Sequence, residues 1–177
     1  LERVGSTLRE EAVAELKVQQ ATEERARTDW TPQITVDAAA LMPESYIGDL
    51  DLRLAMYRRL AALEDPREVD ELAAELVDRF GKLPVETAQL LQIVTIKQLC
   101  KRANVAKLDA GPKGIVVAFQ DNRFPKPERL ISWIQGTRGQ AKVRPDHRLV
   151  LLRETKSPAE RLKAARKLVD ELASLAV

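Results

Sequence analysis

Apolar residues in this chain change their spacing near residue 104, and this change limits the possible folds more than any other feature. Before residue 104 they recur every three or four positions, as on helices that pack in a core. After it, short apolar runs flank Gly- and Pro-containing turns, which is typical of β-hairpins. The sequence therefore predicts an α+β fold, in which a helical half precedes a small antiparallel sheet of two hairpins with packed helices.

Start and stop signals divide the helical half into three helices. The first begins after Asp49, and the second begins at the capping box Asp65-Pro66-Arg67-Glu68. Gly81 follows the second helix at the position of a left-handed C-cap. Pro84 opens the third helix, which we expect to end near Asn104.

The second half alternates hairpins with helices. The first hairpin is predicted over Val105–Phe119, and a short helix over Pro127–Gln135 follows it. A second hairpin is expected over Ala141–Leu152, around a turn at Pro145-Asp146. The last helix begins at Ser157-Pro158-Ala159-Glu160, which reads as a full capping box.

The first 48 residues carry the weakest pattern. An amphipathic helix is predicted from Thr7 to about Arg27, and residues 33–37 alternate as a short strand or an extended arm would. We expect residues 21–48 to form a linker. The predicted division is thus an N-terminal helix with an extended linker at 1–48 and an α+β domain at 49–177.

Composition excludes several classes of protein. Among the 177 residues, 45% are apolar and 32% charged, which excludes a disordered chain. The 29 basic and 27 acidic residues are too balanced for a protein that coats nucleic acid. A single cysteine indicates a reducing compartment such as the cytoplasm, and no apolar run is long enough to span a membrane. Because the chain starts with Leu1 and shows no signal peptide, we expect a piece of a longer protein.

Few side chains could carry chemistry, and each has a simpler interpretation. The segment Gly111–Gly114 lacks the spacing of a phosphate-binding loop and fits a hairpin turn. His147 lies beside Asp146 in a turn, and Cys100 falls within a long helix, where a buried thiol is inert. The only histidine excludes a multi-histidine metal site. We therefore predict no catalytic, cofactor-binding or metal-ligating residue, and no enzyme activity.

Basic residues gather in two places, but the interpretation as a solvated surface is favoured over nucleic-acid binding. Only Phe124 is interleaved with them, whereas single-stranded nucleic acid needs several stacking side chains. The last helix is expected to carry its basic residues on its outer side. The two groups are Lys97, Lys101, Arg102 and Lys107, then Arg123, Lys126 and Arg129, and the last helix carries Arg161, Lys163, Arg166 and Lys167.

Glu75, Asp78 and Arg79 form the most informative charged patch. Their spacing of i, i+3 and i+4 places them together on a helix, next to Gly81. One interpretation is a local ion pair between Glu75 and Arg79, which contributes little on an exposed helix. The other is a docking surface, where charged pairs set register and specificity. Spacing alone favours the local pair.

Two motifs occur in this order along the chain. The first runs from Leu41-Met42-Pro43 through Tyr46-Ile47 to Tyr57-Arg58-Arg59-Leu60, and the second from Glu75-Leu76-Val77-Asp78-Arg79-Phe80-Gly81 to Leu83-Pro84. Together they closely resemble the C-terminal domain of the bacterial transcription-repair coupling factor, the Mfd ATPase family. The similarity runs from about Leu8 to the end of the chain, and the hairpins are its least distinctive part.

The resemblance implies a regulatory domain without catalytic activity. Members of the family are DNA translocases that displace stalled RNA polymerase and recruit UvrA to nucleotide excision repair through a UvrB-like N-terminal module. Their C-terminal domain packs on that module, masks UvrA binding and represses the motor. Glu75, Asp78 and Arg79 match the positions at this intramolecular contact. The resemblance therefore favours the docking surface over the local ion pair. UvrA and RNA polymerase would be indirect partners, and an accessory DNA-binding module is the alternative.

Overall fold

The computed structural model describes residues 10–18 and 30–177, and contacts divide the chain into two units, Leu1–Thr31 and Pro32–Val177. In the first unit, residues 10–18 are helical and exposed. These residues agree with the predicted helix from Thr7 to Arg27, while both of its ends lie outside the described residues. Among the described residues, no helix combines the length and the apolar character needed to cross a membrane.

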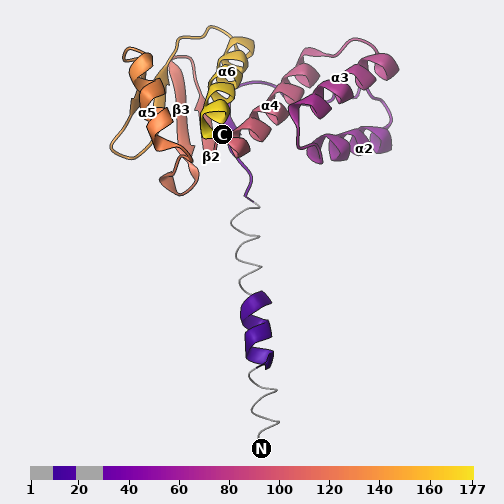
Figure 1. Ribbon diagram of the computed structural model, residues 1–177. Helices are drawn as coiled ribbons and strands as arrows, with labels where there is room; N and C mark the ends of the chain where they lie inside the picture. Colours follow the sequence, from indigo (N-terminus) through magenta and orange to yellow (C-terminus); the bar gives the residue numbers. More distant parts are fainter. Residues whose placement is uncertain (1–9, 19–29) are drawn as a thin grey trace, which may run out of the picture. The chain divides into compact units, whose positions relative to one another are not determined.

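Three helices form the first half of the second unit, as predicted (Figure 1). They are α2 (Leu50–Ala61), α3 (Pro66–Phe80) and α4 (Val85–Arg102). Each helix contributes buried side chains, such as Met56, Leu72 and Leu91, to one helical core. The three-to-four-residue spacing of the apolar residues therefore marks the faces that the helices bury against one another.

The predicted caps are present, with two differences in detail. Asp49 accepts hydrogen bonds from the first turn of α2, and Asp65 completes a capping box with Glu68 on α3. Gly81 has φ +89° and ψ −167°, so its positive φ is confirmed, but it does not adopt the left-handed helical conformation. At α6 (Pro158–Ala176) only half of the capping box forms, because the Glu160 carboxylate accepts from the N–H of Lys156 instead of that of the cap residue.

Both predicted hairpins form, and they join a five-stranded sheet of order β1-β2-β3-β5-β4. One pairs β2 (Val105–Ala110) with β3 (Gly114–Phe119), and the other pairs β4 (Ala141–Val143) with β5 (Leu149–Leu152). The sheet is mixed and not purely antiparallel, because β1 (Gln33–Thr35) pairs parallel to β2.

Strand β1 also changes the interpretation of the linker. Ile34 pairs with Leu108 in the sheet, and both Met42 and Ile47 are buried in the helical core. Residues 33–47 are thus part of the folded unit, which begins at Pro32 and not at Asp49. The alternation at residues 33–37 allows a short strand or an extended arm, and the structure has the strand. Its partner could not be predicted from this pattern, because β2 lies some seventy residues further along the chain.

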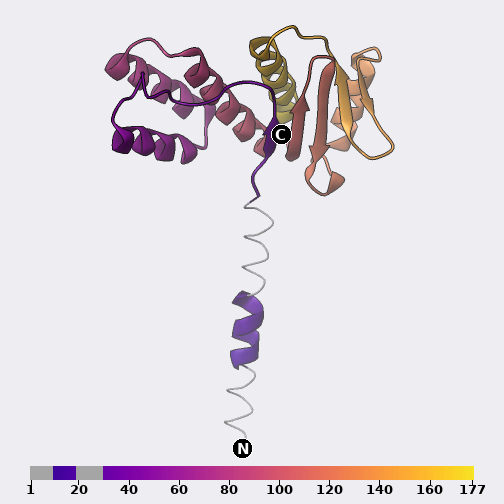
Figure 2. The same ribbon diagram turned by 180° about the vertical axis from the view of Figure 1, so that it is seen from behind.

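Helices cover one face of the sheet. The strand β3 leads through a 3₁₀ turn (Gln120–Asn122) to α5 (Pro127–Gly136), and α6 packs against α4. Figures 1 and 2 show α4, α5 and α6 on the same side of the strands, and the opposite face of the sheet without a helix. Helix α4 contributes to both cores, since Leu91 lies in the helical core and Ile96 in the sheet core.

The prediction that all basic residues of α6 lie on its outer side is wrong for Arg161. Its side chain is 9% exposed, and its Nη1 atom donates to both carboxylate oxygens of Asp37 at 2.7 Å. Its Nε atom also donates to the hydroxyl of Thr155 at 3.1 Å. The ion pair joins α6 to the segment that follows β1. Helical spacing could not reveal it, because the partner lies 124 residues away in the sequence.

Candidate functional site

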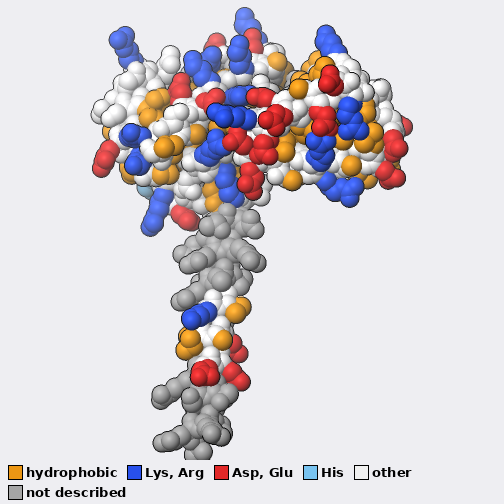
Figure 3. Space-filling view, turned by 45° about the vertical axis from the view of Figure 1, so that its right-hand side comes forward, with side chains coloured by type: hydrophobic (Ala, Val, Ile, Leu, Met, Phe, Trp, Pro, Cys, Tyr) orange, Lys and Arg blue, Asp and Glu red, His pale blue; other side chains and the backbone are white. Residues whose placement is uncertain are grey.

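The three predicted docking residues lie on the exposed side of α3, near its C-terminal end. Asp78 and Arg79 are exposed and Glu75 is half-exposed, whereas Leu72 and Leu76 on the opposite side are buried in the helical core. The α2–α4 half of the molecule shows acidic, basic and apolar side chains intermixed on its surface (Figure 3). The predicted patch therefore exists as a surface, and we call Arg59, Glu75, Asp78 and Arg79 together the α3 surface.

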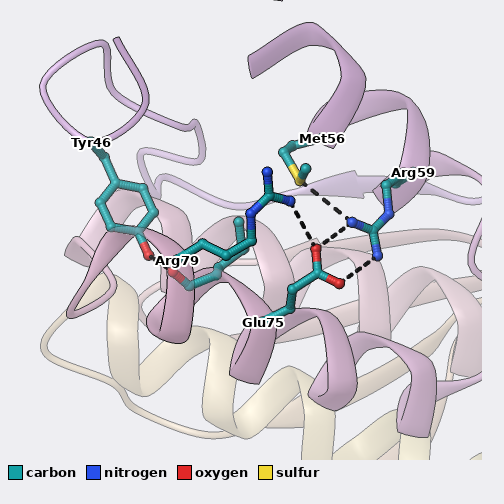
Figure 4. A network of polar contacts seen from close by, with 6 residues as sticks. Tyr46, Met56, Arg59, Glu75 and Arg79 are labelled. Atoms are coloured by element: carbon teal, nitrogen blue, oxygen red, sulfur yellow. Dashed lines mark hydrogen bonds and ion pairs between the residues drawn. The ribbon is translucent and has the colours of Figure 1, made fainter. Parts of the chain in front are cut away.

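Glu75 is the centre of this surface (Figure 4). Arg79 donates to its Oε2 atom at 3.2 Å, which confirms the local ion pair expected from the spacing. Arg59 of α2 forms a second, two-point pair, in which Nη2 donates to Oε1 at 3.0 Å and Nη1 donates to Oε2. The hydrogen bond from Arg59, followed by that from Arg79, lowers the pKa of Glu75. The carboxylate is therefore held in a defined position between two guanidinium groups.

Arg59 is the site residue that the sequence did not predict. It lies 16 residues before Glu75, on another helix, so no spacing rule within one helix could pair the two. The only signal was its place in the first motif, within Tyr57-Arg58-Arg59-Leu60. The same hydrogen bond raises the pKa of Arg59, and the sulfur of Met56 lies 3.8 Å from its Nη1 atom.

Aromatic side chains hold the end of α3 beside this cluster. The Arg79 guanidinium lies 5.1 Å from the centre of the Phe80 ring, a cation–π distance. Phe80 in turn packs edge-to-face against Tyr46, with 5.8 Å between the ring centres. The Tyr46 hydroxyl donates toward the carbonyl oxygens of Leu76 and Gly81, at 3.0 and 2.8 Å. These contacts satisfy carbonyl groups at the helix end, where partners within the helix are missing.

Asp78 differs from its neighbours. Within the described residues, its side chain takes part in no ion pair or hydrogen bond. The α3 surface thus presents one carboxylate without a partner beside one that is already paired. An incoming cationic side chain could bind Asp78 without displacing another contact.

The other candidate residues lie in the core or in turns. Cys100 is fully buried, and burial raises its pKa to about 12, so the thiol stays protonated at neutral pH. His147 lies in the turn between β4 and β5 with φ +66°. The hydrogen bond from Arg144 lowers the pKa of its neighbour Asp146 to about 2. The backbone N–H of Gly111 donates to the carbonyl of Gly114 at 2.9 Å, as in a hairpin turn.

No grouping of His, Cys, Asp and Glu side chains within the described residues could hold a metal ion. The basic groups also give little support for nucleic-acid binding. Arg102 pairs with Asp65 at 3.5 Å, and Phe124 is buried against Phe119 with 5.4 Å between ring centres. The one interleaved aromatic side chain is therefore not available for stacking on a base.

Comparisons with known proteins agree on one family. The family described as the TRCF domain matches residues 36–130. A transcription-repair-coupling factor from Rickettsia prowazekii is 34% identical over 145 residues, which cover 82% of this chain and 13% of that protein. The protein of the same name from Escherichia coli K12 is 28% identical over 170 residues, 96% of this chain and 15% of the relative. The match thus spans 13–15% of the length of these relatives.

A solved structure shows the same fold. It is a crystal structure of the C-terminal domain of a transcription-repair coupling factor, with a TM-score of 0.70 and 20% sequence identity. The match covers 83% of this chain and 94% of the other. The α+β fold, with its helices and its five-stranded mixed sheet, is therefore shared with a solved domain.

Proposed function

This chain belongs to the TRCF-domain family of transcription-repair coupling factors, and from that premise we propose that it is the regulatory C-terminal domain of such a protein. It docks on the UvrB-like N-terminal module of the same polypeptide, masks the surface that binds UvrA and represses the DNA translocase motor. In this role the domain carries no catalysis of its own and acts in the cytoplasm with its parent protein. The arrangement of Glu75 between Arg59 and Arg79, next to the unpaired Asp78, is the observation that carries the proposal.

The α3 surface suits reversible docking because its charges are positioned before a partner arrives. Glu75 is held from two sides, and Tyr46 fixes the helix end that carries Arg79. Preorganised charges lose less conformational entropy on binding, so more of their attraction appears as affinity. A polar surface also stays well hydrated after the domain is released, unlike a large apolar patch.

A modest contact is enough for this kind of regulation. Keeping the docked and open forms at a ratio of 99:1 requires a free-energy difference of about 2.7 kcal/mol. This is half of the free energy needed to shift the equilibrium from 1:99 to 99:1. A contact of this strength can be displaced by a partner that binds the open form more tightly. RNA polymerase and UvrA are the proposed partners of the open parent protein, and neither needs to touch this domain.

The test uses the full-length parent protein with Asp78→Lys and Arg79→Asp together. We expect UvrA binding and ATPase activity without polymerase both to rise, because the reversed charges weaken the docked form. Glu71→Lys is the matched control, since Glu71 is also exposed on α3 but lies outside the α3 surface. If crosslinking shows that the contact is lost while neither activity rises, the regulatory function is wrong.

An accessory DNA-binding module is the second candidate, motivated by the basic groups on α4 and around α5. It predicts an affinity of this chain for duplex DNA that falls steeply with salt. The Arg102–Asp65 ion pair already neutralises one of these cations, which argues against it. A gel-shift assay at low salt separates the two candidates, because docking alone predicts no shift.

A further inference from the structure

A cavity of about 210 Å³ opens between α5, β5 and α6, on elements that do not contribute to the α3 surface. Leu151, Ala164 and Leu168 give it an aliphatic lining, and the indole of Trp133 forms part of its wall. Ala164 and Leu168 are almost fully buried, so the cavity reaches down to the sheet core. Its volume is below the roughly 300–1,000 Å³ of small-molecule sites, and therefore suits a single side chain better than a whole cofactor.

Charged side chains line the same cavity, two of them basic and one acidic. Trp133 is held in place because its Nε1 atom donates to Glu171 at 2.9 Å. The exposed cations Arg153 and Lys167 also line the cavity, and within the described residues neither side chain takes part in an ion pair or hydrogen bond. An aliphatic pocket thus lies next to two cationic side chains without carboxylate partners.

We propose that this cavity is a binding site for a protein segment that inserts one aliphatic side chain, such as leucine, flanked by carboxylates. The aliphatic side chain would contact Leu151 and Leu168 beside the indole of Trp133. The flanking carboxylates would pair with Arg153 and Lys167, which supply the charge complementarity. Anchoring of one apolar side chain in a pocket with charges around it is how small interfaces concentrate their binding energy.

Single-stranded nucleic acid fits the same observations less well. Such ligands need a continuous basic groove and several stacked bases, whereas this cavity offers one indole and an aliphatic floor. We therefore favour an acidic protein segment as the occupant.

The experiment follows the indole N–H signal of Trp133 in ¹H–¹⁵N NMR spectra of the 177-residue chain. Trp133→Phe assigns the signal, because the chain contains only two tryptophans. The probe is the peptide acetyl-Gly-Asp-Leu-Asp-Gly-amide, compared with the same peptide carrying Lys for both Asp, and with one carrying Gly for Leu. We expect a saturable shift of the signal with the first peptide, and binding at least about fivefold weaker for either comparison peptide.

The double variant Arg153→Glu, Lys167→Glu should lose the response, while Lys163→Glu should keep it. Lys163 is exposed on α6 but does not line the cavity, so it controls for the reversal of a charge elsewhere on the same helix. An absent shift, equal shifts from the acidic and basic peptides, or stronger binding of a thymidine oligonucleotide would each overturn the proposal. Because these residues lie outside the α3 surface, the result is independent of the proposed regulatory function.

Discussion

The ion pair between Arg161 and Asp37 should contribute measurably to the stability of the folded unit, unlike the surface ion pairs of the same chain. Removing the carboxylate by Asp37→Ala leaves the guanidinium, which is only 9% exposed, with Thr155 as its remaining side-chain partner. Hydrogen bonds to charged groups contribute about 1.5–3 kcal/mol. Because the Asp37 side chain is itself 67% exposed, we expect the lower end of that range, about 1.5 kcal/mol.

Urea unfolding measures this difference, and Asp170→Ala is the matched control. Asp170 also pairs with an arginine of α6, at 3.8 Å, but that arginine, Arg166, is 37% exposed, against 9% for Arg161. The control should change the free energy of unfolding by less than about 0.5 kcal/mol. The loss of unfolding free energy in Asp37→Asn should fall between those of the two alanine variants, because the amide keeps one acceptor oxygen but no charge.

Two results would refute the reasoning. The first is an equal effect of Asp37→Ala and Asp170→Ala, which would mean that burial of Arg161 does not strengthen its ion pair. The second is a larger loss for Arg161→Met than for Asp37→Ala. The methionine variant removes the buried charge itself and keeps most of the apolar stem, so leaving Arg161 without Asp37 should be the more costly change.

Three further perturbations test the local structure. Gly81→Ala should destabilise the fold by about 1–3 kcal/mol in denaturant unfolding, because φ is +89°. An added Cβ there meets no atom within 4 Å, so a clash is not the cause, and Gly136→Ala, which is equally open but without positive φ, should be close to neutral. The buried Cys100 thiol, with its pKa raised to about 12, should resist a disulfide reagent at pH 8 until the chain is unfolded; rapid labelling of the native protein would contradict this. The pKa of Asp146 falls from 3.8 to about 2 in the folded state, so its contribution to stability is present above pH 3.8 and is lost as the pH falls through about 2. Asp146→Asn should remove this part of the pH dependence of the unfolding free energy. An unchanged pH dependence between about pH 4 and pH 2 would argue against the lowered pKa of Asp146.

Local signals made much of the fold predictable from the sequence. Helix α3 was expected with its observed limits, because its capping box and its apolar series lie directly next to each other, within residues 65–80. The two hairpins were expected for the same reason, since their turns and alternating strands are short-range features. The Glu75–Arg79 pair belongs to this class, because one turn of a helix brings the two side chains together.

Tertiary structure alone decided the features that depend on contacts between distant parts of the chain. Arg59 reaches Glu75 only because α2 packs beside α3, and Arg161 is buried only because Asp37 lies next to α6. Strand β1 is a strand because β2 offers it a free edge, and the cavity beside Trp133 exists only where α5, α6 and β5 meet. Sequence spacing reports which residues share one helix face or one strand face. It carries no information about which faces meet, because those pairings depend on how the whole core packs.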